Sequence, residues 1–233
     1  DPGFRYDSCV GHAFSSDGIN FTCHEKPVIT WSLNGKGKLD YQDPRVTKID
    51  QTYYMVYCIW ENGTTYRVYP GYAISDDLRN WRHMGPLIKF NDHGYNKNAL
   101  LFPEKINGKF VAFHRPENPE FRALPEENFN WQTWSRGDCT QPGTGISLAL
   151  SSDLSEWSHS RLIMTTSKGN WDSVKIGPGA PPIKTPKGWI NLYHGVDENH
   201  VYRLGISLLD LDDPTIVLKR QDESILEPEM GWE

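Results

Sequence analysis

The sequence feature that most constrains the fold is a short strand-and-turn unit that recurs along the chain. Each copy has an alternating strand, then a Ser-Asp cluster, then an aromatic residue three or four positions later. Asp and Ser side chains accept hydrogen bonds from nearby backbone amides in turns, so the cluster predicts a hairpin. The copies are GHAFSSDGINF (11–21), GYAISDDLRNW (71–81) and ISLALSSDLSEW (146–157), with a weaker one in RLGISLLDLDDP (203–214).

A second repeated unit interleaves with the first. In each copy a proline precedes a short strand that contains lysine, a polar turn follows, and an aromatic alternating strand returns. The copies are DPRVTKIDQTYYMVY (43–57), FPEKINGKFVAFHR (102–115) and PPIKTPKGWINLYHG (181–195). Repetition on this scale, made of strands and turns, is typical of a β-propeller with about four strands per blade.

The pattern predicts an all-β fold. Helical periodicity is nearly absent, because windows of about a dozen residues are interrupted by Gly or Pro before an apolar stripe can form. A β-sandwich would also place strands at short regular intervals. Two interleaved repeats that stay in phase favour the radial repetition of a propeller instead, and three to four blades are visible in the 233 residues.

The overall charge argues against two classes of partner. With 24 Lys and Arg against 30 Asp and Glu, the chain has a net charge of −6 and no basic stripe for nucleic acid or an anionic membrane. Apolar runs fall short of the roughly 18 residues that a membrane helix needs. Nine Trp and eleven Tyr suit a cleft in which aromatic rings stack on sugars, although core packing would also account for them.

The four cysteines give no metal or redox signal. Cys9, Cys23, Cys58 and Cys139 lack CxxC spacing and a histidine at zinc-ligand spacing. Free thiols in a reducing compartment are the simplest interpretation, which favours a cytoplasmic location, while two disulfides stay open. No signal peptide is visible, and the chain opens at DPGFRYD without methionine, so we expect the natural N-terminus to lie further upstream.

Several charged residues occupy equivalent positions in successive repeats. The inner strands of propeller blades converge at one mouth of the central channel, which would gather Asp43, Lys97, Asn98, His114, Arg115, Lys175 and His194. One acid among cations and imidazoles suggests an anionic ligand held beside a proton donor. Each residue alone has a structural alternative, since Asp43 could cap a turn, Arg115 could form a surface ion pair and His194 could be a strand histidine.

The segment at about 117–144 interrupts the repeat. It is too polar and too rich in proline to be a blade, and long loops of this kind often carry function. We therefore expect an inserted loop that contributes to the choice of ligand.

The longest motifs resemble glycoside hydrolase family 130, which contains inverting β-mannoside phosphorylases and some β-mannosidases. The resemblance covers almost the whole chain and is carried by QDPRVTKI, NALLFPEKINGKF with its HRP, VKIGPGAPPIKTPKGW, YHGVD and YRLGISLLDLDDP. It implies a five-bladed β-propeller that forms one catalytic domain over 1–233. We expect segments that the family has at both ends to lie outside this sequence.

The resemblance also implies roles for individual residues. Asp43 would be the general acid and would protonate the glycosidic oxygen through the 3-hydroxyl of the mannosyl unit, while Arg45 would orient Asp43 or the sugar. Phosphate would attack the anomeric carbon from the opposite face, with inversion. The phosphate clamp would consist of Lys97, Asn98, Arg115, Lys175, His194 and Tyr202. At Lys97 one branch of the family has arginine, so the charge is kept but the bidentate geometry is lost.

The expected reaction converts a β-mannosyl sugar and phosphate into α-mannose 1-phosphate and a shorter sugar. No cofactor is expected; phosphate is a co-substrate, the other partner is a β-mannoside oligosaccharide, and a homo-oligomer is left open. Two alternatives remain. An inverting β-mannosidase would need a carboxylate base, for which Glu126 and Glu127 are candidates. A carbohydrate-binding propeller without activity would use the same cleft and lack turnover.

Overall fold

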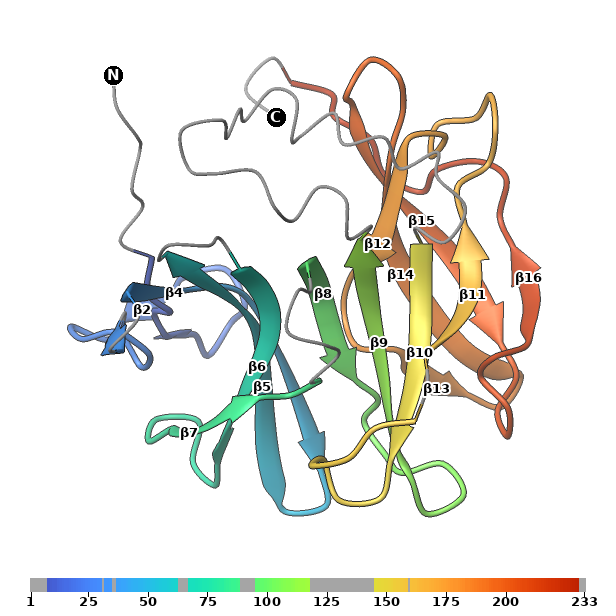
Figure 1. The fold of residues 1–233 in the computed structure, drawn as a ribbon. Helices are drawn as coiled ribbons and strands as arrows, with labels where there is room; N and C mark the ends of the chain where they lie inside the picture. Colours follow the sequence, from blue (N-terminus) through green and yellow to red (C-terminus); the bar gives the residue numbers. More distant parts are fainter. Residues whose placement is uncertain are drawn as a thin grey trace.

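Strands dominate the structure, and no helix occurs in the part of the chain that is described. The computed structural model (Figure 1) describes residues 8–30, 32–34, 37–62, 67–88, 95–117, 145–158 and 160–230. The first strands, β1 (Ala13–Phe14) and β2 (Thr22–Cys23), form a separate antiparallel hairpin. The following strands assemble into three antiparallel units that we call blades 1, 2 and 3.

Blades 1 and 2 each follow chain order from the inner to the outer strand. Blade 1 consists of β4 (Gly37–Ile49), β5 (Thr52–Asn62), β6 (Arg67–Ser75) and β7 (Arg82–Pro86), and β3 (Ser32–Asn34) pairs with β4. Blade 2 consists of β8 (Tyr95–Leu101), β9 (Phe110–Glu117), β10 (Gly145–Ser151) and β11 (Arg161–Thr165). A parallel bridge between Val68 and Tyr95 joins β6 to β8 and links the two blades.

Blade 3 repeats this arrangement with one additional short strand. It consists of β12 (Lys175–Pro178), β14 (Gly188–Val196), β15 (Tyr202–Leu209) and β16 (Val217–Arg220), and β13 (Ile183–Thr185) pairs with β14. The three blades stand side by side in Figure 1. Three successive four-stranded units confirm the predicted all-β propeller class.

The Ser-Asp clusters form the turns that the repeat predicted. In blade 1 the amides of Asp77 and Leu78 donate to Ser75 Oγ at 3.2 and 3.0 Å, and the amides of Arg79 and Asn80 donate to Asp77 Oδ1 at 2.8 Å. The same pattern recurs around Asp17 and Asp153. The residue after the Asp has a left-handed conformation in all three turns: Gly18 (φ 74°), Leu78 (φ 63°) and Leu154 (φ 68°).

The apolar core lies between blades rather than within one sheet. Between blades 2 and 3, the ring of Phe102 meets those of Phe113 and Trp189 edge to face at centroid distances of 4.8 and 5.2 Å, and all three are buried. Between blades 1 and 2, Val56 packs in a buried cluster with Leu101 and Ala112. Both faces of the blade 2 sheet are therefore covered, which fixes its inner strand relative to its neighbours.

Three further expectations concern features other than the strands. Among the described residues, Cys9, Cys23 and Cys58 are free thiols, no helix is long and apolar enough to cross a membrane, and no group of side chains could hold a metal ion. Cys139 lies outside the described residues, as do positions 118–144 of the expected inserted loop.

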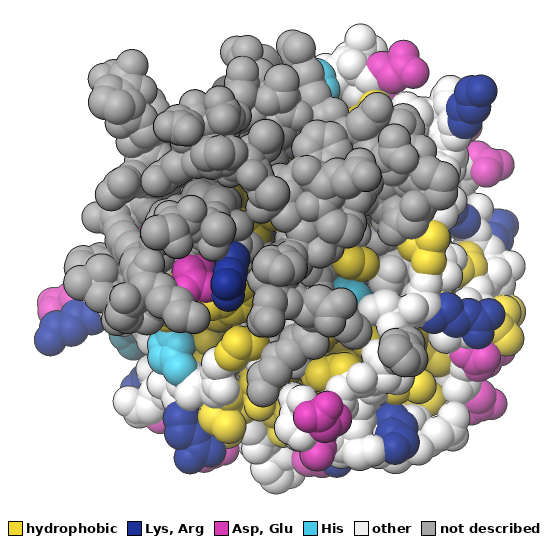
Figure 2. Space-filling model, viewed as in Figure 1, with side chains coloured by type: hydrophobic (Ala, Val, Ile, Leu, Met, Phe, Trp, Pro, Cys, Tyr) yellow, Lys and Arg dark blue, Asp and Glu magenta, His cyan; other side chains and the backbone are white. Residues whose placement is uncertain are grey.

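The surface carries charges of both signs. Figure 2 shows described acidic and basic side chains interspersed over the viewed face.

Candidate active site

Two equivalent β-bulges interrupt the inner strands of blades 1 and 2. In blade 1, Gln42 pairs with Cys58 and Arg45 with Val56, so Asp43 and Pro44 together oppose one residue. In blade 2, Lys97 pairs with Arg115 and Leu100 with Phe113, so Asn98 and Ala99 do the same. A bulge bends its strand and redirects side chains, and bulges are common beside active sites. The first residue of each pair, Asp43 or Asn98, has φ 55°.

Arg45 links the bulge of blade 1 to the inner strand of blade 3. Its Nε donates to the carbonyl of Gly179 at 2.7 Å and its Nη2 to the carbonyl of Pro178, the last residue of β12, at 3.2 Å. Its Nη1 donates to the carbonyl of Asp43 at 3.0 Å. A guanidinium with three such bonds holds a rigid position. Arg45 therefore fixes the backbone of Asp43 against blade 3, which favours the orienting half of its predicted role.

Arg115 and His194 meet between blades 2 and 3. Arg115 is 5% exposed, and its Nη1 donates to His194 Nε2 at 3.4 Å. Gly177 of β12, which pairs with His194, makes room for this contact. A Cβ atom at Gly177 would lie 2.7 Å from His194 Nε2 and 3.0 Å from Arg115 Nη1, closer than Cβ atoms normally approach.

Lys175 and Tyr202 lie beside this pair at the same end of blade 3. Lys175 Nζ donates to the hydroxyl of Tyr202 at 2.5 Å, and the rings of Tyr202 and His194 have centroids 6.0 Å apart. Tyr202 is 52% exposed, so its hydroxyl borders solvent. A cavity of about 330 Å³, lined in part by His194 and Tyr202, opens next to them.

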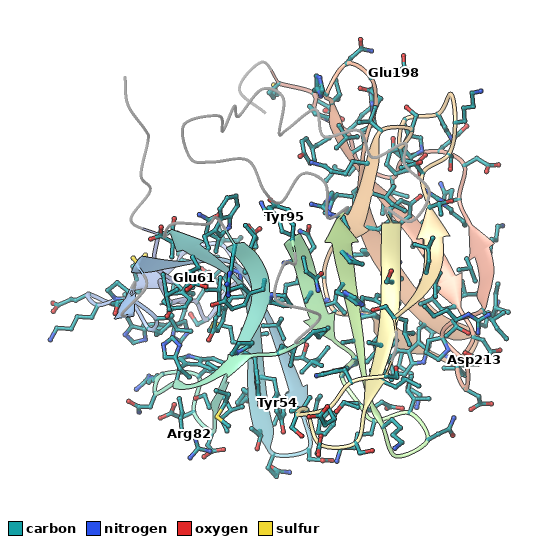
Figure 3. All side chains as sticks on the ribbon, viewed as in Figure 1. Tyr54, Glu61, Arg82, Tyr95, Glu198 and Asp213 are labelled. Carbon is teal, nitrogen blue, oxygen red and sulfur yellow. The ribbon has the colours of Figure 1, made fainter. Side chains whose placement is uncertain are left out.

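Lys97 and Asn98 lie in β8, the inner strand of blade 2, where Lys97 pairs with Arg115 of β9. Lys97 Nζ lies 4.0 Å from the ring centroid of Trp60, and the side-chain Oδ1 of Asn98 is buried without a hydrogen-bond partner among the described residues. Figure 3 marks this end of the blades by Glu61 and Tyr95, whereas Tyr54 lies at the opposite end. The predicted phosphate ligands thus come from strands of blades 2 and 3, whereas Asp43 lies in blade 1.

The electrostatics show how closely these groups are placed. Burial, followed by the charges of Arg115, Lys175 and Arg45, holds the pKa of His194 well below its usual range, although a hydrogen bond to the Pro178 backbone opposes this. His194 is therefore neutral near pH 7. Burial also lowers the pKa of Arg45, and the charge of Asp43 acts against it.

Cys58, a buried residue near these charges, is uncharged. Burial raises the pKa of Cys58 to about 12, in spite of the opposing charge of Lys97, so the thiol keeps its proton. Cys58 is 2% exposed and pairs with Gln42 next to the Asp43 bulge. Cations beside buried, uncharged side chains attract an anion more strongly than they would in water.

His114 does not join this group, which corrects one expectation. Its side chain is fully buried, with Nδ1 3.2 Å from Asn96 Oδ1 and Nε2 2.9 Å from Ser160 Oγ. Successive side chains of a strand point to opposite faces, so His114 turns away from the blade 3 side that Arg115 occupies. It is a structural histidine, and burial lowers its pKa to about 3.

Some contributors to the site were not found from the sequence. Gly177 could have been noticed, because a glycine inside a strand often marks a close approach. The carbonyls of Pro178 and Gly179 carry no side-chain signal, and the ring of Trp60 becomes relevant only through the contact between blades. Glu126 and Glu127, the base candidates for hydrolysis, lie outside the described residues.

Nearly the whole sequence matches a known protein family. The model of glycoside hydrolase family 130, described as β-1,4-mannooligosaccharide phosphorylase, matches residues 6–233. The chain belongs to glycoside hydrolase family 130. With the three observed blades, membership in this family confirms the predicted resemblance and the five-bladed propeller class, of which the described residues supply three blades.

Individual relatives of this family 130 chain are similar over nearly all of its length. It is 40% identical to a 1,2-β-oligomannan phosphorylase of Thermoanaerobacter sp. (strain X514) over 98% of this chain and 67% of the relative. It is 41% identical to a β-1,2-mannobiose phosphorylase of the same organism over 99% of this chain and 66% of the relative. The chain thus spans about two thirds of the length of these relatives.

A solved structure of the family shares the fold. The β-1,2-mannobiose phosphorylase from Listeria innocua in complex with β-1,2-mannobiose superposes with a TM-score of 0.75 and 35% identity. The match covers 95% of this chain and 55% of that one.

Proposed function

We propose that this family 130 protein is an inverting β-mannoside phosphorylase. The observation that carries the proposal is the contact between Arg115 and His194 across two blades, next to Lys175. Two permanent cations and a neutral imidazole offer several donors to one compact anion, and phosphate oxygens accept such donors well. A site built to activate water would gain little from this concentration of positive charge.

The chemistry proposed for Asp43 is the one that membership in family 130 implies, and the link from the Asp43 backbone through Arg45 to blade 3 supports it. Phosphate held by Arg115, Lys175, His194 and Tyr202 would attack the anomeric carbon, forming a new carbon–oxygen bond. The glycosidic carbon–oxygen bond would break on the other face, and the leaving oxygen would take the proton of Asp43 by way of the 3-hydroxyl of the sugar. The product would be α-mannose 1-phosphate, because a single displacement inverts the anomeric centre.

The relatives favour β-1,2-linked mannosides as the substrate class. A β-1,2-mannobiose phosphorylase and a 1,2-β-oligomannan phosphorylase are both at least 40% identical to this chain. The family model is described by a β-1,4-mannooligosaccharide activity, so the linkage is a separate question.

A panel of substrates tests the proposal. The protein would be incubated with phosphate and, in separate samples, β-1,2-mannobiose, β-1,4-mannobiose or mannosyl-glucose, and mannose 1-phosphate would be measured. We expect it from β-1,2-mannobiose at the highest rate. Release of mannose 1-phosphate from none of the three would refute the proposal, and sugar binding without turnover would favour a carbohydrate-binding propeller.

A further inference from the structure

A turn at one end of blade 3 leads directly into Tyr202. Residues 197–201 connect β14 to β15, and Tyr202 is the first residue of β15. Lys175, Val196 and Tyr202 pair side by side across β12, β14 and β15. The position of the Tyr202 ring relative to Lys175 and His194 therefore depends on how this turn is built.

Asp197 holds the turn together through one of its carboxylate oxygens. Its Oδ1 accepts hydrogen bonds from the amides of Asn199 at 2.9 Å and Val201 at 3.1 Å. The amide of His200 donates to the carbonyl of Asp197 at 3.0 Å, and His200 has a left-handed conformation with φ 62°. A residue other than glycine seldom adopts this conformation, so the turn depends on the bonds to Asp197.

Arg203 ties the other carboxylate oxygen of Asp197 to the strand beyond Tyr202. Its Nη1 donates to Asp197 Oδ2 at 2.7 Å, and its Nε donates to Glu227 Oε2 at 2.9 Å. Burial acts to raise the pKa of Asp197, but its hydrogen bonds, that from Arg203 above all, outweigh burial and lower the pKa. Tyr202 thus stands between Val201 and Arg203, which are both bound to a charged Asp197.

The side chain of Tyr202 contacts two residues of the candidate site. Its hydroxyl accepts a hydrogen bond from Lys175 Nζ at 2.5 Å, and its ring centroid lies 6.0 Å from that of His194, which contacts Arg115. A tyrosine hydroxyl can donate one proton while it accepts, and an ammonium group has no acceptor. The proton of Tyr202 is therefore directed at another partner, and a bound phosphate oxygen suits it because hydrogen bonds in such a chain strengthen one another.

We propose that Asp197 and Arg203 are positioning residues of the phosphate site, and that they act by holding the hydroxyl of Tyr202 against Lys175. The inference rests on the proposed phosphorylase function, in which Lys175, His194 and Tyr202 bind inorganic phosphate. Asp197 and Arg203 act through Tyr202 rather than by touching the anion, because two carboxylates already bind the guanidinium. Their effect should appear in the affinity for phosphate rather than in that for the mannoside.

Steady-state kinetics of phosphorolysis can separate this role from a merely structural one. The phosphate KM, the mannoside KM and kcat would be measured for the unaltered protein, Asp197→Ala and Asp197→Asn. We expect Asp197→Ala to raise the phosphate KM about tenfold, the effect of losing one hydrogen bond to a charged ligand, with a much smaller change in the mannoside KM. Asp197→Asn keeps an oxygen that accepts from the turn amides, so it should recover most of the affinity.

A double variant shows whether the effect passes through Tyr202. Tyr202→Phe removes the hydroxyl and keeps the ring, and by itself it should raise the phosphate KM. In a Tyr202→Phe background, Asp197→Ala should add almost nothing to the phosphate KM, because both changes remove the same contact. Arg203→Met should raise the phosphate KM as well, and it replaces Asp197→Ala if that variant does not fold.

Asp210 provides a matched control on the same strand. It directly follows β15, and its Oδ1 accepts from the amides of Asp212 at 2.9 Å and Asp213 at 3.0 Å, much as Asp197 does in its own turn. Figure 3 shows the two turns at opposite ends of blade 3, where Glu198 and Asp213 are labelled. Asp210→Ala should lower the melting temperature, as Asp197→Ala does, and leave the phosphate KM unchanged.

The kinetics can overturn the inference in distinct ways. An unchanged phosphate KM in both Asp197→Ala and Arg203→Met would show that these residues do not position Tyr202. Equal increases in the phosphate KM and the mannoside KM, or additive effects of Asp197→Ala and Tyr202→Phe, would indicate general damage to the site. Absence of phosphate-dependent turnover in the unaltered protein would instead refute the proposed function, and the inference with it, which distinguishes the two failures.

Discussion

Asp43 and Asn98 occupy the same position in two consecutive blades, and both have φ 55°. Each begins a bulge in an inner strand, and the left-handed conformation that the bulge requires is tolerated best by Asn and Asp after glycine. An amide serves the backbone in blade 2 as well as a carboxylate does in blade 1. The fold therefore gives no reason for a carboxylate at Asp43, and its presence points to chemistry.

Asp43→Asn should separate the chemistry from the backbone geometry. Asparagine keeps the left-handed conformation and the size of the side chain but cannot donate an acidic proton. We expect kcat for phosphorolysis to fall by about 100-fold or more, the usual contribution of a general acid. The melting temperature should stay within about one degree, since a surface substitution that leaves the core and the backbone conformation unchanged has little effect on stability. Unchanged turnover would show that Asp43 only shapes the turn.

The reciprocal change, Asn98→Asp, adds a negative charge to the predicted phosphate site while preserving the bulge. We expect the phosphate KM to rise by about tenfold, since a like charge nearby opposes binding of the anion. The melting temperature provides the control for folding. A phosphate KM equal to that of the unaltered protein would place Asn98 outside the site.

Arg115→Met should weaken phosphate binding. Arg115 is buried, donates to His194 and supplies a permanent charge. Removing one partner of such a contact should raise the phosphate KM by about thirtyfold or more. Arg115→Lys keeps the charge, so its phosphate KM should lie between those of the unaltered protein and Arg115→Met. The mannoside KM is measured alongside. Loss of both affinities to the same degree would contradict a specific role in binding phosphate.

Gly177→Ala should disturb the same pair from the opposite side. A methyl group at this position would come within 2.6 Å of His194 Cε1, so the imidazole would have to move away from Arg115. We expect a higher phosphate KM and a lower melting temperature. Gly11→Ala is the matched control, because a methyl group there meets nothing within 4 Å. If both variants behave alike, close packing at Gly177 does not matter for the site.

The stability of the protein should fall as the pH drops from about 6.5 toward 5. Burial lowers the pKa of His114 to about 3 and also lowers those of His83 and His194. Below about pH 6.5 the unfolded chain binds protons that the native state does not, so each such histidine costs up to about 1.4 kcal/mol per pH unit. This stability is fully present above that range.

Urea unfolding between pH 7.5 and 5 measures this dependence. Carboxylates contribute little in this window because their ordinary pKa values lie near 4. In His114→Gln the slope should decrease by about one proton relative to the unaltered protein. A free energy of unfolding that is constant or increases toward pH 5 would contradict the burial of neutral histidines.

Local chemistry explains which parts of the structure were predictable from the sequence. The Ser-Asp turns depend on hydrogen bonds within a few residues, so Ser75 and Asp77 could be assigned without tertiary information. The repeat then placed Arg115 and His194 at equivalent positions, and the structure brings them together. Their roles in binding phosphate remain predictions.

Other features depend on register and on packing between blades. Whether His114 or Arg115 faces the site changes with a shift of one residue, and the bulge at Asn98 sets that register. The bonds of Arg45 to Pro178 and Gly179 join residues more than 130 positions apart. The ring of Trp60 near Lys97 also comes from another blade. No local pattern in the sequence encodes these contacts.

The phosphate dependence of mannoside cleavage tests the central claim most directly. The protein would be incubated with mannobiose in the presence and absence of phosphate, and mannose 1-phosphate and free mannose would be measured over time. We predict α-mannose 1-phosphate in the sample with phosphate and almost no cleavage without it. Free mannose released at the same rate in both samples would contradict a phosphate site formed by Arg115, Lys175 and His194.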